Sequence, residues 1–536
     1  MHDIPVLLPD EGHSAPTESE RQRARQIIAG FHGTLPPKVV PAYYRLGLIL
    51  VAAMLVLLPL LYVSLVGAVG YGVYYHAVTN THLLTGDHSS RTHRSRGSAK
   101  GAVVAYFGPI VIGIILIGLM VKPLFARDAQ PGTERKLRRE DEPVFFDVVD
   151  HLCGVVGCAP PKEIIVDHQV NASASFCPGV WDFLTGRLRL TVGLPLAAGL
   201  TLPQFVGVLG HEFGHFTQRG GMSMTNAIIS FINNWLTRVV HGRDQWDEWL
   251  AQASGAGIGV FVVIAWGARA MVWLTRKFLW CLMTIGKAVS CFLLRQMEYD
   301  ADRVEALLVG TDTFAGAMQR FPFLTVAANY AQNTLNETLS DNHLADDYPA
   351  MVQLSVGRLT SDDIAQIQKT VNDDTTGFFS THPAAKDRMK RVAESAPAGI
   401  FAPALPGQTG ATKAAGAAVL FRDFGDLCRR YTRELYREVY GERTPPVTLC
   451  PTGEIARRHE IEVLSAQAFH RYFQATANPL RALPLPAAMP AAASTCDATL
   501  LVAARERMWQ MKAAYLESFR QYDEHDTHLL QAEQAH

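Results

Sequence analysis

Charged residues are scarce in this sequence. Only 18% of the 536 residues are Asp, Glu, Lys or Arg, whereas a typical soluble chain is about 25% charged. The hydrophobic fraction is an ordinary 48%, so the shortage indicates long uncharged stretches and not a richer core throughout. The formal net charge of −1 excludes a basic nucleic-acid binder, and the hydrophobic fraction excludes a wholly disordered chain.

Paired cysteines are also lacking. The eight cysteines contain no Cys-x-x-Cys motif, the spacing that is typical of zinc-thiolate and redox sites. The closest pair, Cys153 and Cys158, flanks a Gly-Val-Val-Gly stretch and is interpreted as packing. The sequence therefore predicts neither a disulfide framework nor a zinc-thiolate site.

Two stretches contain no Asp, Glu, Lys or Arg at all, residues 46–78 and 101–121. Each is longer than the about 20 residues that cross a bilayer as a helix, and charge-free runs of this length are rare in soluble helices. Both are therefore predicted to be transmembrane helices in a lipid bilayer. The first thirty residues are polar and charged, so we expect no cleavable signal peptide, and the first span would act as an uncleaved anchor.

Lysine and arginine near the two spans predict the orientation. Three precede the first span and six follow the second, whereas four lie in the loop between them. Because positive residues are retained in the cytoplasm, the N-terminus and the large downstream region are predicted to be cytoplasmic. We therefore expect a multi-pass protein of the cell (inner) membrane whose catalytic domain faces the cytoplasm.

A third region has few charges, residues 250–294. Its two apolar pieces, 258–274 and 278–294, meet at the step Thr275-Arg276-Lys277, and each piece contains one internal cation. A cation is costly at the centre of a bilayer unless it reaches the surface or finds a partner. Two interpretations stay open: a helical hairpin in or against the membrane, and an amphipathic helix pair packed on the soluble domain.

The rest of the sequence favours a mainly α fold with a small β-sheet. A helix is predicted over residues 142–156, and a capping box formed by Thr201 and Gln204 opens another helix that continues to about Thr217. Short strand-like runs lie between these helices, at residues 162–166, 170–176 and 187–192.

The second of these helices contains the pentapeptide His-Glu-Phe-Gly-His, residues 211–215. Histidines four residues apart lie on one helical face and can bind one metal ion, and the glutamate between them can act as general base toward a metal-activated water. The flanking residues are apolar, so the imidazoles are expected to be buried and to need a partner. Gly210 and Gly214 each weaken a helix by about 1 kcal/mol relative to Ala, which predicts close approach of another backbone. The alternative is a pair of histidines satisfied by core hydrogen bonds.

Catalytic zinc usually has three protein ligands and one open position, so another residue must complete the set. The best candidate is Glu298, in the segment Met-Glu-Tyr-Asp-Ala-Asp that directly follows the third low-charge region. Asp302 lies four residues later on the same helical face and can accept a hydrogen bond from the outer N–H of a ligand histidine. The alternative is a solvated acidic face on an ordinary helix.

Together, these two motifs resemble the gluzincin arrangement, and in particular the M48 family of membrane metallopeptidases. Two spans before the first motif and an apolar hairpin before the second match the layout of HtpX-like members. The resemblance implies one Zn²⁺ per chain, bound by His211, His215 and Glu298, with Glu212 as general base. It also implies that Asp302 supports a ligand histidine by accepting a hydrogen bond from its outer N–H.

The resemblance extends over about residues 142–392 and suggests that His382 and Arg388 lie near the site. His382 either acts in catalysis by helping to stabilise the oxyanion or has a structural role beside Pro383. Asn171 and Arg388 are the candidates for substrate binding. Asn171 lies in a strand-like run, where an extended peptide can be aligned by edge pairing.

The predicted fold is a gluzincin-type metallopeptidase domain with transmembrane helices and a helical C-terminal extension. The sequence is divided into a polar N-terminal tail (1–42), two transmembrane helices with their loop (43–125), an M48-like zinc peptidase domain (126–394), a linker rich in Ala, Gly and Pro (395–420) and the helical extension (421–536). Within the extension, helices are predicted at 421–439, 454–473 and 500–531, with a break at 478–494.

These features predict an integral membrane zinc endopeptidase that hydrolyses peptide bonds of membrane or misfolded proteins. Its partners would be protein or peptide substrates and the lipid bilayer, and no nucleic acid is expected. The alternative is a membrane-anchored scaffold or sensor, in which the zinc site is structural and the C-terminal helices bind a protein partner. An intact general base argues against that alternative, because a structural site does not need one.

Overall fold

The computed structural model divides into two compact units, Met1–Thr448 and Leu449–His536. The predicted break at 478–494 and the last predicted helix, 500–531, lie outside the described residues. The structure describes residues 6–7, 16–36, 42–85, 96–121, 134–177, 181–182, 185–217, 228–229, 231–233, 235–237, 240, 260–377, 382–395, 397–403, 415–441 and 447–473.

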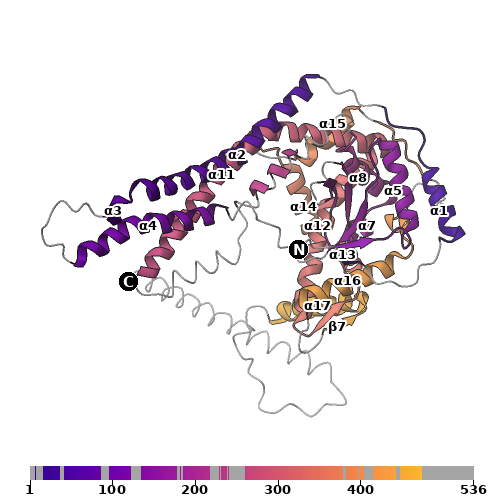
Figure 1. Ribbon diagram of the computed structural model, residues 1–536. Helices are drawn as coiled ribbons and strands as arrows, with labels where there is room; N and C mark the ends of the chain where they lie inside the picture. The colour runs from indigo at the N-terminus through magenta and orange to yellow at the C-terminus, as the bar shows by residue number, and fades with distance from the viewer. Residues whose placement is uncertain are drawn as a thin grey trace, which may run out of the picture. The chain divides into compact units, whose positions relative to one another are not determined.

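The described residues are mostly helical (Figure 1). The helices that begin and end in the first unit are α1 (Glu18–Ile28), α2 (Ala42–Thr79), α3 (His82–Thr85), α4 (Arg96–Val121), α5 (Pro143–Val156), α7 (Leu194–Gly199), α8 (Leu202–Gly214), α11 (Val260–Val309), α12 (Thr311–Leu339), α13 (Tyr348–Val356), α14 (Ser361–Asp373), α15 (Ala385–Ser395), the 3-10 helix η2 (Ala417–Leu420) and α16 (Phe424–Tyr440). The second unit contains α17 (Thr452–Phe473).

A small five-stranded sheet lies among these helices, with strand order β1-β2-β3-β5-β4. Its strands are β1 (Val6–Leu7), β2 (Arg135–Leu137), β3 (Glu163–Asp167), β4 (Ala172–Phe176) and β5 (Leu188–Gly193), and two further short strands are β6 (His343–Ala345) and β7 (Thr448–Cys450). β3 pairs parallel with β5, and β4 pairs antiparallel with β5. β4 is therefore an edge strand of this sheet, and it lies against α8.

The elements predicted around the sheet are confirmed. α5 has Pro143 in its first turn and ends at Gly157, whose left-handed φ of 85° suits glycine. The three central residues of β3 are buried, as expected for a strand inside a sheet. β1 and β2 have no counterpart in the sequence prediction, because two and three residues are too few to show a strand period.

The helix that contains the first motif begins as predicted. The Thr201 side chain accepts a hydrogen bond from the Gln204 N–H at 3.4 Å, and Gln204 Oε1 accepts one from the Thr201 N–H at 3.0 Å, which is the reciprocal pattern of a capping box. α8 ends at Gly214, and His215 is its C-cap. The helix is therefore slightly shorter than the predicted end near Thr217, and hydrogen bonds of a single tighter turn continue to that residue.

The predicted helical hairpin over 258–294 is wrong where the structure describes this region. Residues 260–309 form one continuous helix of 50 residues, α11, which passes through Thr275-Arg276-Lys277 without a turn. This step contains no Gly or Pro, so no residue there interrupts the helix. Lys277, one of the two cations at this step, also has aromatic partners, because its Nζ lies 5.8 and 5.5 Å from the ring centroids of Trp273 and Trp280.

The upstream part of α11 packs beside α2 and α4 (Figure 1). A buried apolar cluster joins these helices to short helical pieces between residues 228 and 240. By length and composition, two helices of the described chain could cross a membrane, Arg45–Thr79 and Trp273–Val309. The first coincides with the predicted span 46–78. The predicted span 101–121 is helical in α4, whose apolar stretch in the described residues is the shorter Ala105–Gly118.

Segments before and after the central domain pack onto it. α1 lies on α5, and Arg422 Nε donates to Glu20 Oε1 of α1 at 2.6 Å. The first part of the predicted linker also packs on the domain, because Ile400 N donates a hydrogen bond to Leu308 O of α11 at 2.9 Å. Arg135 of β2 is buried and donates to two glutamates of α16, at 2.7 and 2.8 Å. Thus parts of the predicted tail, linker and extension are integral to the first compact unit.

Candidate active site

The candidate site forms where α8 packs tightly against the downstream part of α11. A Cβ atom added at Gly214 would lie 3.3 Å from Ala301 Cα, and one added at Gly210 would lie 2.1 Å from Leu308 Cδ1. The close approach predicted from these two glycines is therefore confirmed, with backbone as the neighbour at Gly214 and a leucine side chain at Gly210. This contact brings the motif of α8 next to the acidic residues of α11.

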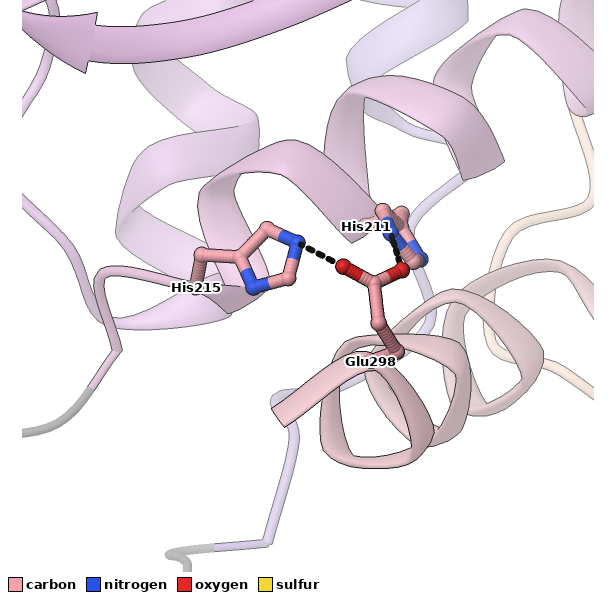
Figure 2. Close-up of side chains that lie close together, drawn as sticks. All are labelled: His211, His215 and Glu298. Carbon is pink, nitrogen blue, oxygen red and sulfur yellow. Dashed lines mark ion pairs between the residues drawn. The ribbon is translucent and has the colours of Figure 1, made fainter. Parts of the chain in front are cut away.

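His211, His215 and Glu298 converge at this contact, and Figure 2 shows the Glu298 carboxylate pointing between the two rings. His211 Nε2 lies 3.7 Å from Glu298 Oε2, and His215 Nε2 lies 3.8 Å from Glu298 Oε1. The two imidazole rings are 5.0 Å apart and nearly perpendicular. One donor atom from each residue lies within 4.8 Å of the others.

This donor set fits a catalytic zinc ion. Two imidazole nitrogens and one carboxylate oxygen are a known three-ligand set for catalytic zinc, with ligand distances of about 2.0–2.2 Å. Tetrahedral ligands at that distance are about 3.4 Å apart, and the histidine-to-glutamate separations of 3.7 and 3.8 Å are close to this value. His211 and Glu298 are buried, so a cation there would face little competition from water.

Carboxylates surround the outer nitrogen of His211. Its Nδ1 atom lies 3.2 Å from Asp302 Oδ1 and 3.6 Å from Glu305 Oε2. Asp302 in turn accepts hydrogen bonds from Arg388 Nε at 2.9 and 3.1 Å and a further one from Arg388 Nη2. The position of Asp302 therefore matches its predicted support of a ligand histidine. The pairing of Arg388 with buried Asp302 favours a supporting role, and substrate binding by Arg388 stays a prediction.

The two histidines have opposite electrostatic environments. Burial alone would lower the pKa of His211, but the neighbouring Asp302 and Glu298 carboxylates raise it well above its usual value. Burial lowers the pKa of His215 to about 4, and the neighbouring His211 adds to this shift. The carboxylates around His211 thus favour positive charge at this position, which a bound metal ion would supply, and the surroundings of His215 favour the neutral ring that a metal ligand needs.

Glu212 connects the motif to the sheet. Its Oε2 accepts a hydrogen bond from the backbone N–H of Ala174 in β4 at 3.1 Å. Burial raises the pKa of Glu212. A glutamate with a raised pKa holds a proton more readily than a free glutamate does, which is the property that a general base and acid needs.

His382 reaches the same centre from the segment before α15. Its Nδ1 atom lies 3.1 Å from Glu298 Oε1, and its side chain is 72% exposed. The Glu298 carboxylate raises the pKa of His382. An exposed imidazole beside the candidate metal ligands can touch a bound substrate, although its contact with Glu298 also suits a structural role.

Asn171 is not part of this cluster. It is exposed and directly precedes β4, and its backbone carbonyl accepts a hydrogen bond from Gly193 N at 2.8 Å. Glu305 is the residue that the sequence reasoning did not single out. The signal was present, because Glu305 follows Glu298 and Asp302 at the spacing of one helical face.

A comparison with known protein families agrees with this geometry. Residues 146–396 match the model of peptidase family M48, and this range contains every residue of the cluster. The chain therefore contains an M48 peptidase domain. The family suggests a metalloprotease, and the match extends from α5 through α15. No curated protein and no solved structure matched the chain.

Proposed function

We propose that this protein is an integral membrane zinc endopeptidase that hydrolyses peptide bonds of membrane or misfolded proteins. The observation that supports it most strongly is the convergence of His211, His215 and Glu298 beside Glu212, within a domain that matches family M48. The five-part domain division predicted from the sequence belongs to the same proposal.

His211, His215 and Glu298 would hold one zinc ion. When bound, zinc would supply a Lewis acid that polarises water and the scissile carbonyl group. Glu212 would take a proton from the attacking water and deliver it to the leaving amine. Asp302, fixed by Arg388, would hold the ring of His211 in one orientation. His382 would help to stabilise the oxyanion by donating a hydrogen bond to it.

The edge strand β4 offers a way to align the substrate. Its far side has no partner strand among the described residues, and Ala174 of β4 contacts Glu212. An extended peptide that pairs with such an edge is held by main-chain hydrogen bonds that do not depend on its sequence. Asn171, directly before β4, would bind the substrate at one end of this strand. Such alignment suits an endopeptidase with broad substrates.

Contacts across the first unit support the proposed membrane topology. α1 precedes α2, α5 follows α4, and α1 packs on α5, so both must lie on one side of the membrane. An even number of crossings by α2 and α4 meets this requirement. Together with the predicted excess of positive residues on the outer flanks, it supports an inner-membrane protein with a cytoplasmic catalytic domain.

A Glu212→Gln variant tests the proposed mechanism. The amide has the size of the carboxylate but cannot accept the proton, so we expect zinc to be retained and cleavage of casein to fall by about 10²–10⁴-fold. Zinc content and proteolysis would be measured on purified protein in detergent. An Ile364→Ala variant on α14 is the control and should keep both. Cleavage by Glu212→Gln at the wild-type rate would refute the mechanism.

A membrane-anchored scaffold or sensor is the second candidate. Three apolar side chains of α17 are exposed within the second unit, Ile461, Val463 and Leu464, and they suit a protein partner for the C-terminal helices. This candidate predicts bound zinc without cleavage of any of a broad set of peptides. Turnover that is lost in Glu212→Gln would reject it.

A further inference from the structure

Glu305 lies beside the candidate metal site, and the proposed mechanism gives it no role. It lies on α11 one turn beyond Asp302, it is only 3% exposed, and its Oε2 is 3.6 Å from His211 Nδ1. The facing position on α8 is Gly207, where an added Cβ would lie 2.9 Å from Val309 Cγ2 and 3.3 Å from both Cγ and Oε1 of Glu305. The absence of a side chain at Gly207 thus leaves room for this carboxylate.

A buried carboxylate is unfavourable unless it is paired. Among the described residues, His211 is the ion-pair partner of Glu305. The position therefore has an energetic cost that fold stability does not explain, since an apolar side chain would fill the same space without it. Burial raises the pKa of Glu305 to about 7, and the neighbouring His211 opposes this shift. A contribution to that histidine explains why a carboxyl group stands there.

Asp302 and Glu305 differ in what else they contact. Arg388 donates three hydrogen bonds to Asp302, whereas its attraction to Glu305 is a longer-range electrostatic one. The guanidinium cancels much of the negative charge of Asp302 as felt by the imidazole. Asp302 consequently fixes the direction of the His211 ring, and Glu305 supplies the negative charge behind it.

We propose that Glu305 is a positioning residue that acts through His211 and strengthens its binding of a divalent metal ion. The inference rests on the proposed function, in which His211 Nε2 is a zinc ligand. A negative group behind a ligand imidazole makes the metal-facing nitrogen more basic, and partners of this kind change metal affinity by about 10–100-fold. Glu305 thereby adds a second carboxylate to the support given by Asp302.

The test is the zinc affinity of Glu305→Gln in the detergent-solubilised full-length protein, measured by competition with a chromophoric chelator. The glutamine keeps the size of the side chain and its packing on Gly207. We expect zinc to bind about 10-fold more weakly, while the thermal midpoint of the metal-free protein stays the same or rises. Glu305→Asp, which keeps the charge farther from the ring, should recover part of the affinity.

Two controls separate the possible outcomes. Ser290→Ala changes a buried polar residue of α11 in the apolar cluster region and should leave zinc affinity within about 2-fold. A zinc affinity of Glu305→Gln equal to that of wild type would overturn the inference, and so would a loss of affinity that Glu305→Asp does not recover and that accompanies a lower metal-free midpoint. Failure of the proposed function would look different: zinc binding without cleavage of casein would reject the peptidase, and equal zinc binding by His211→Ala and wild type would reject the zinc site itself.

Discussion

The two parts of α11 use the same helix for opposite environments. In the upstream part, the large apolar side chains of Trp273, Trp280 and Phe292 are exposed. In the downstream part, beyond Arg295, the acidic side chains of Glu298, Asp302 and Glu305 are buried. One part therefore resembles a helix surrounded by lipid, and the other contributes buried charged side chains to the candidate site.

The difference shows that the surroundings, and not the helix, determine which residues are tolerated. Exposed aromatic residues are unfavourable in water but suit a bilayer and its interface. Buried carboxylates are unfavourable in a dry interior unless cations face them, and here His211 and Arg388 do so. The proposed topology therefore predicts that each part of α11 tolerates different substitutions, which the following variants test.

Loss of the buried cation should have the largest effect. Arg388→Met keeps much of the length of the side chain but leaves the buried Asp302 without its hydrogen-bonded partner. Removing one member of a buried ion pair costs about 3–5 kcal/mol, so the free energy of unfolding should fall by that amount. Denaturant unfolding of the detergent-solubilised protein measures it, and a loss below about 1 kcal/mol would show that Asp302 is already solvated.

A charge in the upstream part should have the next largest effect. Ile285 of α11 is 44% exposed, so Asp at this position would be tolerated in water. Near the centre of a bilayer, Asp instead costs about 2.5–3.5 kcal/mol. We therefore expect Ile285→Asp to reduce the fraction of the protein that is inserted in isolated membranes.

The matched control for this charge is Ile364→Asp. Ile364 lies on α14 of the peptidase domain and is 36% exposed. Its substitution should change stability by no more than about 0.5 kcal/mol, as is usual for a water-exposed site. Equal tolerance of both substitutions would remove the contrast between the two parts of α11.

Loss of a hydrogen-bonded polar pair beside the apolar cluster of α2 and α11 should have the smallest effect on the free energy of unfolding. Asn233 Nδ2 donates to Ser290 Oγ at 3.0 Å, and Ser290 Oγ donates to Gly286 O at 2.7 Å. Hydrogen bonds between helices in a membrane contribute about 0.6 kcal/mol on average. Ser290→Ala should therefore lower the free energy of unfolding by about that amount, and a loss above 2 kcal/mol would indicate a water-filled or functional site.

Local signals were enough to predict much of the site. The capping box at Thr201 and the histidine pair of α8 depend on residues within a few positions of each other, and the M48 match agrees with the resemblance drawn from them. The pairing of Glu298 with these histidines required the chemistry of a third ligand, since 83 residues separate it from His215. The need for a third metal ligand therefore selected Glu298 as a partner of the histidines, a long-range contact that helical periodicity alone could not predict.

The parts that the sequence did not predict depend on tertiary context. The continuity of α11 through Thr275-Arg276-Lys277 follows from the absence of a helix breaker, which two cations had obscured. β1 and β2 are too short for a pattern. Glu305 became significant only when α8 was placed opposite it, because the relevant space belongs to Gly207, almost a hundred residues earlier.

The continuity of α11 also has a mechanical consequence. A helix of 50 residues without a break moves as a single rod. Glu298 lies 13 residues from Ile285, or about 20 Å along the axis, so a tilt of about 3° around Ile285 displaces its carboxylate by about 1 Å. Displacements of this size change enzymatic rates about 100-fold. In the proposed membrane topology, the thickness of the bilayer would therefore become a variable of the proposed chemistry.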